Sequence, residues 1–469
     1  MNKAKEIFRY PEEIKAAFLA SGGLTFENKQ VSAEEIWRFM TVDGPTRFPA
    51  SFTIDPNLGG FSPDVDFFAG IKHNYYRLTE FDRLRNRYQR GKKIVVVQDG
   101  PTELLQACGC VAARPPFHWM WAMRDVEGLS LEEAERRNSA LRNECKKCMP
   151  AECCSIVAPF HTVRTSKAPV DFLAPVSYMA CSDAVFTIET TRSDDNPVPS
   201  FIMDFPVHDH SGSWRVEYLA AQFRLLARKL GAITSIKVTD EALNTVIVRQ
   251  NRLRRLAREC TKLWWDAPTP PLNSSDRFVL GLRCWEQEDE TAVIELLTEA
   301  RAEVARRVTD RIKGAGIVDD PVRILVCGSC AHLNAHMVEQ AGGVIVGNEE
   351  WLNNMTMHID ETGDPFINLA SAACAMPYEQ PPEKRAAWIA QLAQMSRADG
   401  VIFIYNWGCN YQSAMARVLM DIVKTKTGLP TTWLDIIQSG RQTSGEQLRT
   451  RVEAFIEIMQ RHRAAKKIK

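Results

Sequence analysis

The sequence of 469 residues is 45% hydrophobic and 25% charged, and its 58 basic side chains balance 58 acidic ones. A chain of this length exceeds one typical core, so we expect two domains or slightly more. With a formal net charge of zero, nothing favours binding to nucleic acid or to an anionic membrane surface.

The N-terminal stretch Met1–Tyr10 alternates charged and apolar side chains and lacks the hydrophobic run of a signal peptide. No segment approaches the roughly 20 apolar residues of a membrane-spanning helix. We therefore expect a cytoplasmic protein that does not cross a membrane. Its 13 cysteines are then unusual, because cytoplasmic thiols stay reduced and an odd number cannot all pair. We expect them to be small buried residues or metal ligands.

Residues 1–90 are predicted to form an N-terminal extension, largely helical, that wraps on the body of the protein. Prolines and a glycine pair interrupt its middle, and such residues end helices and mark turns. They are Pro45, Pro49, Pro56, Gly59-Gly60 and Pro63. The extension is therefore expected to consist of helices joined by irregular segments.

A first α/β domain is predicted over residues 91–235. The β-branched run Lys93–Val97 is typical of a buried strand. Asp99-Gly100-Pro101 ends this strand with a turn, and a helix is expected to start at Thr102. Later elements of this domain are a strand at Phe201–Phe205 and a helix over Trp214–Leu230.

Residues 236–316 are predicted to form a helical connector, which includes a helix over Thr239–Cys260, and residues 317–469 a second α/β domain with a C-terminal helix. Alternating strands and helices are typical of a parallel sheet covered on both faces. The expected strands are Arg323–Val326, Gly343–Gly347, Gly400–Tyr405 and Thr431–Leu434. The expected helices are Glu383–Ala398, Ala414–Thr427 and Gly445–His462. The fold class is therefore α/β, with two tandem, flavodoxin-like domains that contain parallel sheets.

Cysteines follow strand-like runs in both predicted domains. Cys327 and Cys409 lie after predicted strands of the second domain, and Cys181 follows a weaker apolar run in the first. The pair Cys153-Cys154 lies at a predicted loop-to-helix junction. In open α/β sheets, ligands bind beyond the carboxyl ends of the strands. One such cysteine is more often structural, but their recurrence favours a metal cluster held between the two domains.

Other metal and nucleotide sites are less favoured. Two pairs have the spacing of a zinc knuckle, Cys145/Cys148 and Cys327/Cys330, but most of a domain separates them. Structural zinc therefore stays open without being favoured. The chain has no Gly-x-Gly-x-x-Gly motif after a strand and no Walker-type phosphate loop, so we do not expect it to hydrolyse ATP itself.

Several stretches of the sequence resemble the catalytic component of 2-hydroxyacyl-CoA dehydratases and of the related ATP-dependent benzoyl-CoA reductases. The clearest are Ala398–Phe403, Trp407-Gly408-Cys409, Gly428-Leu429-Pro430 and Gln447–Phe455. Arg323–Ser329 with Ala341–Gly347 resembles the start of the family's second domain, and Pro101–Leu105 resembles the segment before its first helix. The resemblance extends from Lys93 to Arg461.

This resemblance implies one [4Fe–4S] cluster per subunit, held by cysteines that correspond to Cys154, Cys181 and Cys409. The adjacent Cys153 leaves the first ligand ambiguous. Three thiolates leave one iron open to water or substrate. The family reduces an acyl-CoA thioester by one electron to a ketyl radical, under anaerobic conditions. The resemblance therefore also implies a separate ATP-hydrolysing iron–sulfur activator and a homologous second subunit in a homo- or heterodimer.

Glu103 corresponds to a family carboxylate near the substrate, and it is the candidate catalytic acid or base. Its position in the first turn of a predicted helix offers a second interpretation. A carboxylate there stabilises the helix through the helix dipole. Both roles stay open from the sequence.

Two departures from the family pattern leave alternatives. Ser439–Gly445 replaces an Asp-Pro-Arg element that the family often carries, so the sequence does not decide between dehydration and ring reduction. The cysteines at 145, 148, 327, 330 and 374 exceed the number that one cluster needs. They leave open an [8Fe–9S] double-cubane cluster in a low-potential reductase of small molecules. Two further alternatives are a non-catalytic partner subunit of the same fold and a zinc-stabilised binding protein.

Overall fold

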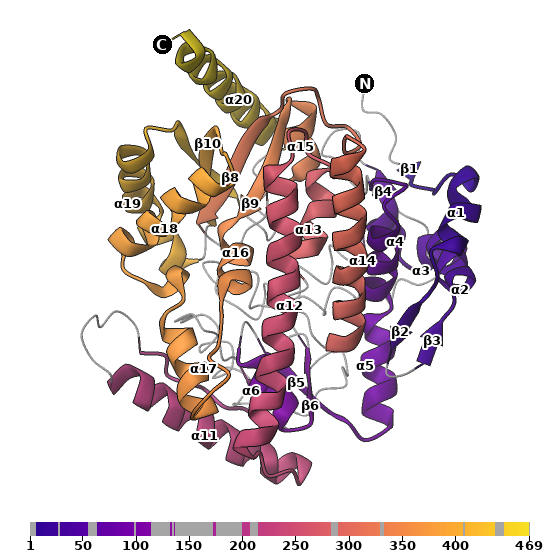
Figure 1. The fold of residues 1–469 in the computed structure, drawn as a ribbon, viewed down its shortest axis with the longest axis vertical. Coiled ribbons are helices and arrows are strands. Elements are labelled where there is room, and N and C mark those ends of the chain that lie inside the picture. Colours follow the sequence, from indigo (N-terminus) through magenta and orange to yellow (C-terminus); the bar gives the residue numbers. More distant parts are fainter. Residues whose placement is uncertain are drawn as a thin grey trace.

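The computed structural model of the protein describes residues 6–26, 29–54, 63–97, 100–113, 132–133, 136, 172–174, 199–206, 214–282, 289–328, 333–406, 409–436 and 445–468. The described part is a mixed α/β structure, in which long helices connect two parallel sheets (Figure 1). The predicted fold class, α/β with parallel sheets, is confirmed. The division of the chain near residues 90, 235 and 316 stays a prediction.

The N-terminal part combines short helices with two small antiparallel strand pairs. Its helices are α1 (Lys15–Ala20), α2 (Ala33–Arg38), α3 (Gly44–Arg47), α4 (Phe68–Leu78) and α5 (Glu80–Gln89). Its strand pairs are β1 (Glu6–Ile7) with β4 (Thr53–Ile54), and β2 (Leu24–Phe26) with β3 (Lys29–Val31). The helices agree with the prediction, whereas the strand pairs were not predicted. Strands of two or three residues are too short for alternation to mark them.

The first parallel sheet has the strand order β6-β5-β7. Its strands are β5 (Lys93–Val97), β6 (Cys110–Ala113) and β7 (Phe172–Ala174), and α6 (Thr102–Ala107) connects β5 to β6. The strand predicted at Phe201–Phe205 is wrong, because these residues form no strand. Phe201, Met203 and Phe205 are nevertheless buried in one core cluster. The alternating apolar residues therefore mark a segment that buries one side in the core without pairing as a strand.

In the described part of the chain, four helices follow the first sheet, and the longest of them links it to the second sheet. They are α11 (Trp214–Thr234), α12 (Asp240–Asp266), α13 (Ser274–Leu282) and α14 (Glu290–Thr309). The helix predicted to start at Thr239 is confirmed, because the Thr239 hydroxyl caps α12 by accepting from Ala242 N at 3.1 Å. Figure 1 shows α12 running from the first sheet to the second, with α14 packed alongside.

The second parallel sheet has the strand order β11-β10-β8-β9. Its strands are β8 (Val322–Gly328), β9 (Gly343–Asn348), β10 (Gly400–Asn406) and β11 (Thr431–Ile436), which confirms the four predicted strands. The helices of this part are α15 (Ala335–Gln340), α16 (Glu349–Thr356), α17 (Pro365–Cys374), α18 (Pro382–Met395), α19 (Asn410–Thr427) and α20 (Gly445–Ile468).

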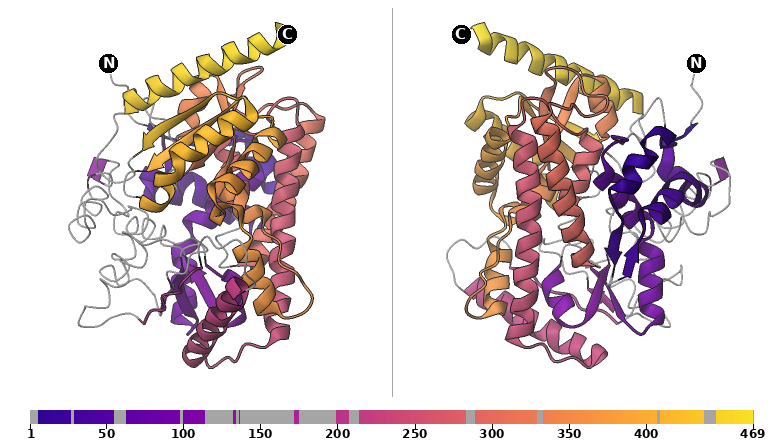
Figure 2. Two further views of the ribbon diagram at one scale, coloured as in Figure 1. Left: turned by 90° about the vertical axis from the view of Figure 1, so that its left-hand side faces the viewer. Right: turned by 45° about the vertical axis from the view of Figure 1, so that its right-hand side comes forward.

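Alternate residues of β8 face opposite layers of helices. Ile324 and Val326 are buried in a cluster with side chains of α15 and α20. Leu325 and Cys327 belong to the cluster that contains side chains of α18 and α19. Figure 2 shows α20 lying across the sheet on the side opposite α19. The sheet is therefore doubly wound, as expected for parallel strands buried on both faces.

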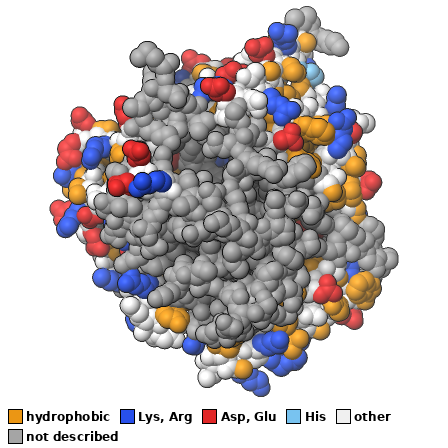
Figure 3. Space-filling view, turned by 180° about the vertical axis from the view of Figure 1, so that it is seen from behind, with side chains coloured by type: hydrophobic (Ala, Val, Ile, Leu, Met, Phe, Trp, Pro, Cys, Tyr) orange, Lys and Arg blue, Asp and Glu red, His pale blue; other side chains and the backbone are white. Residues whose placement is uncertain are grey.

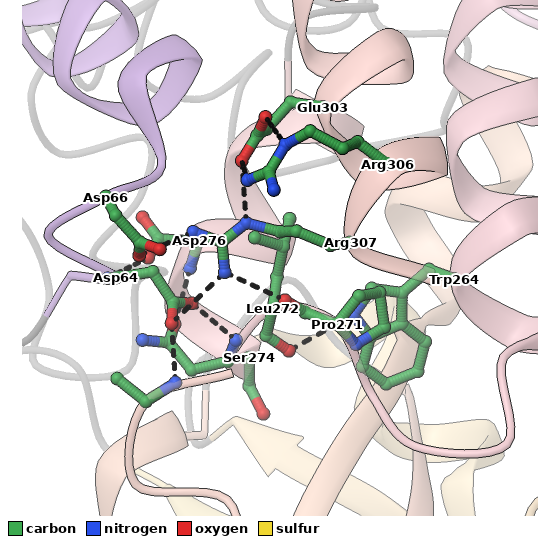
Figure 4. Close-up of polar contacts among 12 residues, drawn as sticks. Asp64, Asp66, Trp264, Pro271, Leu272, Ser274, Asp276, Glu303, Arg306 and Arg307 are labelled. Carbon is green, nitrogen blue, oxygen red and sulfur yellow. Dashed lines mark hydrogen bonds and ion pairs between the residues drawn. The ribbon is translucent and has the colours of Figure 1, made fainter. Parts of the chain in front are cut away.

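A buried polar cluster fastens the N-terminal part to the helices that follow the first sheet (Figure 4). Asp64 N donates to Asp276 Oδ2 at 2.5 Å, and Asp64 Oδ2 accepts from Asn273 N at 2.9 Å. The guanidinium of Arg307 donates to Asp66, Glu303 and the Pro271 carbonyl oxygen. Burial raises the pKa of both Asp64 and Asp276. The N-terminal part thus shares a polar interior with α13 and α14.

Candidate functional site

The order of the strands marks one point on the edge of the second sheet as a candidate ligand site. From β8 the chain crosses to β9 on one side, and it later returns to β10 on the other side of β8. The carboxyl ends of β8 and β10 therefore meet where the direction of winding reverses. In open α/β sheets the loops diverge at this point and leave a binding crevice. Gly328 and Ile404 are register partners near this edge.

Cys409 lies just beyond β10, at this edge of the sheet. It is the N-cap residue of α19, and its side chain is half-buried. The partial positive charge at the start of a helix favours an anionic side chain, such as a thiolate. Cys409 is therefore placed where a metal-ligating thiolate is expected, and its position after a strand agrees with the sequence analysis.

The end of β8 is held by a buried network of hydrogen bonds. Gly328 N donates to Glu349 Oε2 at 2.9 Å, and Gly328 O accepts from Tyr378 Oη at 2.5 Å. The Arg385 guanidinium donates to both Glu349 oxygens and stacks over the Tyr378 ring at 4.0 Å. Gly328 has φ +108°, and a Cβ there would lie 2.5 Å from Ile404 O. Only glycine fits at this position. Together with the hydrogen bonds to Glu349 and Tyr378, this close approach to β10 holds the end of β8 in place.

Other thiols in the described part of the chain are buried in the hydrophobic core. Cys327 is 2% exposed within β8, and burial with the nearby Glu349 raises the pKa of its thiol well above the usual range. Burial also raises the pKa of Cys374, and it raises that of Cys108 to about 12. These three cysteines are therefore small core residues.

Glu103 lies in the first turn of α6, beyond the carboxyl end of β5 in the first sheet. It is fully buried and forms an ion pair with Arg254 of α12, which is also buried. Glu103 Oε2 has no hydrogen-bond partner among the described residues. A buried pair with one unused carboxylate oxygen suits a group that is held for contact with a ligand, because native structures rarely leave such atoms unpaired.

More polar side chains of α12 extend this network towards the surface. Gln250 donates to Gln106 Oε1 at 3.0 Å and to Glu290 Oε2 at 3.2 Å. Burial raises the pKa of Glu290, and repulsion from Glu103 adds to the shift. Glu290 also pairs with the half-exposed Arg249. Glu103 is therefore connected electrostatically to a carboxylate near the protein surface.

Arg254 and the Glu349–Arg385 pair are the residues that the sequence analysis missed. One signal was present for Arg254. The buried stripe of α12, which includes Leu243, Ile247 and Ala257, also carries Gln250 and Arg254. Polar residues on the apolar face of a long helix require buried partners, so they indicate a buried polar network. Nothing in the sequence identifies Glu103 as that partner.

Two of the three predicted cluster ligands, Cys154 and Cys181, lie outside the described residues, as do Cys153, Cys145, Cys148 and Cys330. Within the described ranges, no three His, Cys, Asp or Glu side chains are grouped closely enough to hold a metal ion. The described donor, Cys409, fits a cluster ligand by its exposure and its place at a helix start. The ligand set as a whole stays a prediction.

The doubly wound sheet and the thiol at its carboxyl edge define an α/β protein with a candidate ligand site at the point where the winding reverses. More specifically, the chain belongs to the 2-hydroxyglutaryl-CoA dehydratase D-component family, whose model matches residues 99–459. The match includes Glu103, Cys154, Cys181 and Cys409, and it leaves out the N-terminal 98 residues.

A curated relative is the (R)-phenyllactyl-CoA dehydratase beta subunit of Clostridium sporogenes, which is 23% identical over 249 residues. The match covers 52% of this chain and 64% of the relative. Among the helices that the structure describes, none is sufficiently long and apolar to cross a membrane. Described acidic and basic side chains are interspersed at the margins of the view in Figure 3, in keeping with the balanced charge of the sequence.

Proposed function

We propose that the protein is an iron–sulfur subunit of a 2-hydroxyacyl-CoA dehydratase. The observation that carries the proposal is the family match over residues 99–459, together with the placement of Cys409 at the carboxyl edge of a doubly wound sheet. The name of the relative, a dehydratase subunit that acts on an acyl-CoA, supports the same class of reaction. A benzoyl-CoA reductase-like activity is the nearest alternative.

In this proposal Cys154, Cys181 and Cys409 hold a [4Fe–4S] cluster. When bound, the cluster would supply an iron with an open coordination position and low-potential, one-electron reducing power. The protein positions the thioester and excludes water from it. The rigid end of β8, fixed by Glu349, Arg385 and Tyr378, provides a firm wall beside Cys409 for this purpose.

Glu103 is the proposed acid or base. Elimination of water from a 2-hydroxyacyl group removes the hydroxyl group and a C3 proton, so the site requires a group that accepts or donates a proton. Glu103 Oε2 is buried and has no hydrogen-bond partner among the described residues, while Arg254 holds the carboxylate in place. Arg254 is thus a positioning residue, since it acts through Glu103.

The proposed partners are a homologous second subunit and an ATP-hydrolysing iron–sulfur activator, in the cytoplasm under anaerobic conditions. The relative is named as a beta subunit, which supports assembly with another chain. The absence of a phosphate loop from the sequence supports a separate ATPase.

The double-cubane alternative requires more cysteine ligands than three. Of the extra cysteines, Cys327 and Cys374 are buried in the hydrophobic core of the described chain, whereas Cys145, Cys148 and Cys330 lie outside the described residues. The iron content of the purified chain distinguishes the two cluster types. A non-catalytic subunit of the same fold is the second alternative.

The proposal is tested by the iron and acid-labile sulfide content of the anaerobically purified chain, together with an EPR spectrum of its reduced form. About four irons per chain, with a cluster signal, is the expected result. About eight irons would favour the double-cubane reductase. Zinc, or no metal in strictly anaerobic protein, would contradict the redox mechanism and leave a structural or binding role.

A further inference from the structure

The N-terminal part carries a groove of about 810 Å³, outside the residues that match the family. The hairpin β2–β3, helix α2 and helices α4 and α5 all contribute residues to it. Neither Cys409 nor Glu103 lines this groove. Its volume is within the roughly 300–1,000 Å³ that is typical of small-molecule sites.

Aromatic rings form the floor of the groove. Phe26, Phe39 and Tyr75 line it, and each of these side chains is less than 10% exposed. Phe39 and Tyr75 meet edge to face, with ring centroids 5.1 Å apart. Burial raises the pKa of Tyr75 to about 12, and Glu35 adds to this shift. The phenol therefore stays protonated.

Two arginines on the sides of the groove are held in place by aromatic rings. The Arg83 guanidinium lies 4.1 Å from the Tyr76 ring centroid and 4.9 Å from that of Phe26, and it also donates to the Tyr76 carbonyl oxygen at 2.5 Å and to Thr79 Oγ1. Arg47 lies 5.1 Å from the Phe48 ring centroid and donates to Asp82 at 2.7 Å. Stacking fixes the planes of both guanidinium groups, so less conformational entropy is lost when they bind an anion.

Among the described residues that line the groove, basic side chains outnumber acidic ones. Its acidic residues are Glu35, Asp43 and Asp82, and its basic residues are Lys29, Arg38, Arg47, Arg83 and Arg90. Two of the three carboxylates already face an arginine, since Asp82 pairs with Arg47 and Asp43 lies 3.5 Å from Arg38. The five basic and three acidic side chains leave an excess of two positive charges, and Lys29 and Arg90 are exposed at the rim. An anion is therefore attracted to the groove.

We propose that this groove binds a small ligand that combines a planar ring with an anionic group, as a nucleotide does. The lining offers apolar contact to the ring, and the excess of basic side chains, with Lys29 and Arg90 exposed at the rim, offers charge-assisted hydrogen bonds to phosphate oxygens. The site gives the N-terminal 98 residues a binding function beside the proposed acyl-CoA chemistry. Because it shares no residue with the proposed site, it does not depend on the iron–sulfur cluster or on turnover.

The test uses the full chain and a fluorescent ADP analogue that carries an N-methylanthraniloyl group, with unlabelled ADP as competitor. We expect saturable binding that unlabelled ADP displaces. The variant Lys29→Glu/Arg90→Glu reverses two rim charges and should weaken binding at least about tenfold, since it exchanges attraction for repulsion. The matched control, Arg228→Glu/Lys384→Glu, reverses two exposed charges that do not line the groove and should leave binding unchanged.

Competition by adenosine and by inorganic pyrophosphate separates the two halves of the ligand. Each should displace the fluorescent analogue less well than ADP does, since each lacks either the charge or the ring. Adenosine as effective as ADP would overturn the anionic half of the proposal, and pyrophosphate as effective as ADP would overturn the ring. The proposal as a whole is wrong if no saturable binding occurs, or if both double variants weaken binding equally.

Discussion

The carboxyl edges of the two sheets hold their key side chains in opposite environments. Cys409, beyond the second sheet, is half-buried at the start of a long helix. Glu103, beyond the first sheet, is fully buried and paired with Arg254. A thiol that binds an external group must remain accessible, whereas a carboxylate that acts at one geometry benefits from being fixed. The difference agrees with our proposals that Cys409 is a cluster ligand and that Glu103 is an oriented acid or base.

The largest expected effect is that of Cys409→Ser. It removes a thiolate that we propose as a cluster ligand, so the chain should lose most of its iron and the EPR signal of the reduced protein. Activity should fall by more than the roughly 10–100-fold that follows loss of an outer-shell partner. The measurement is iron per chain after anaerobic purification, with Cys374→Ser as a matched control. Full iron content in Cys409→Ser would remove Cys409 from the ligand set.

The buried ion pair provides the next largest effect. Arg254→Met leaves the Glu103 carboxylate buried without its cation, and loss of one partner of such a pair costs about 3–5 kcal/mol of unfolding free energy. Glu103→Gln/Arg254→Met removes both charges and should regain most of that stability. Urea unfolding measures this double-mutant cycle.

Activity separates the catalytic role of Glu103 from its structural role. If Glu103 is the acid or base, the double variant should be stable but inactive. A double variant that is stable and active would show that Glu103 only supports α6. The single variant Glu103→Gln, which keeps the shape of the side chain, should already lose activity if the carboxylate transfers a proton.

The sequence predicted the regular elements better than it predicted the contacts of the site. Three of the four strands of the second sheet were predicted from apolar runs, which are typical of strands in a covered parallel sheet, whereas Thr431–Leu434, in the edge strand β11, has only two apolar residues. The first helix after β5 was predicted from the turn at Gly100 and Pro101. Contacts such as that between Glu103 and Arg254 join residues 151 positions apart. No local pattern encodes such a distance.

Burial also explains where the sequence analysis of the cysteines was incomplete. Cys327 and Cys409 both follow apolar runs, and spacing alone treats them alike. In the structure β8 continues to Gly328, so Cys327 lies within the strand and faces the core, whereas Cys409 lies three residues beyond the end of β10 at Asn406. A difference of a few residues at a strand end decides between a core thiol and a candidate ligand, and strand ends are the least certain part of such predictions.

A smaller effect concerns the pH dependence of stability. Burial raises the pKa of Glu339 to about 7, and its carboxylate accepts from Ser274 N at 2.6 Å. An unfolded glutamate has a pKa of about 4.3. The folded state therefore holds the proton more tightly, and this contribution to stability is lost as the pH rises from about 4 to about 7.

Glu339→Gln should remove this loss of stability at higher pH, because glutamine stays neutral and keeps an oxygen that accepts the hydrogen bond from Ser274 N. We expect the stability of the wild type, relative to the variant, to fall by on the order of 3 kcal/mol between pH 4 and pH 8. Urea unfolding at several pH values measures the difference, and Glu383→Gln, at an exposed position of α18, serves as the control. Parallel pH profiles for wild type and Glu339→Gln would contradict the assignment.

The smallest effect is expected for Cys327→Ala, which tests the contrast between core and edge thiols most directly. Cys327 lies one residue before Gly328, close to the proposed cluster site, yet its thiol is buried and its pKa is raised well above the usual range. The substitution should leave iron content and the EPR spectrum unchanged, and it should cost about 1 kcal/mol of unfolding free energy for the small cavity. Loss of iron from this variant would mean that the thiol is deprotonated by a metal that it binds, since coordination overrides the effect of burial. In that case proximity to the sheet edge, rather than exposure, would determine which cysteines are ligands, and the larger cluster would regain support.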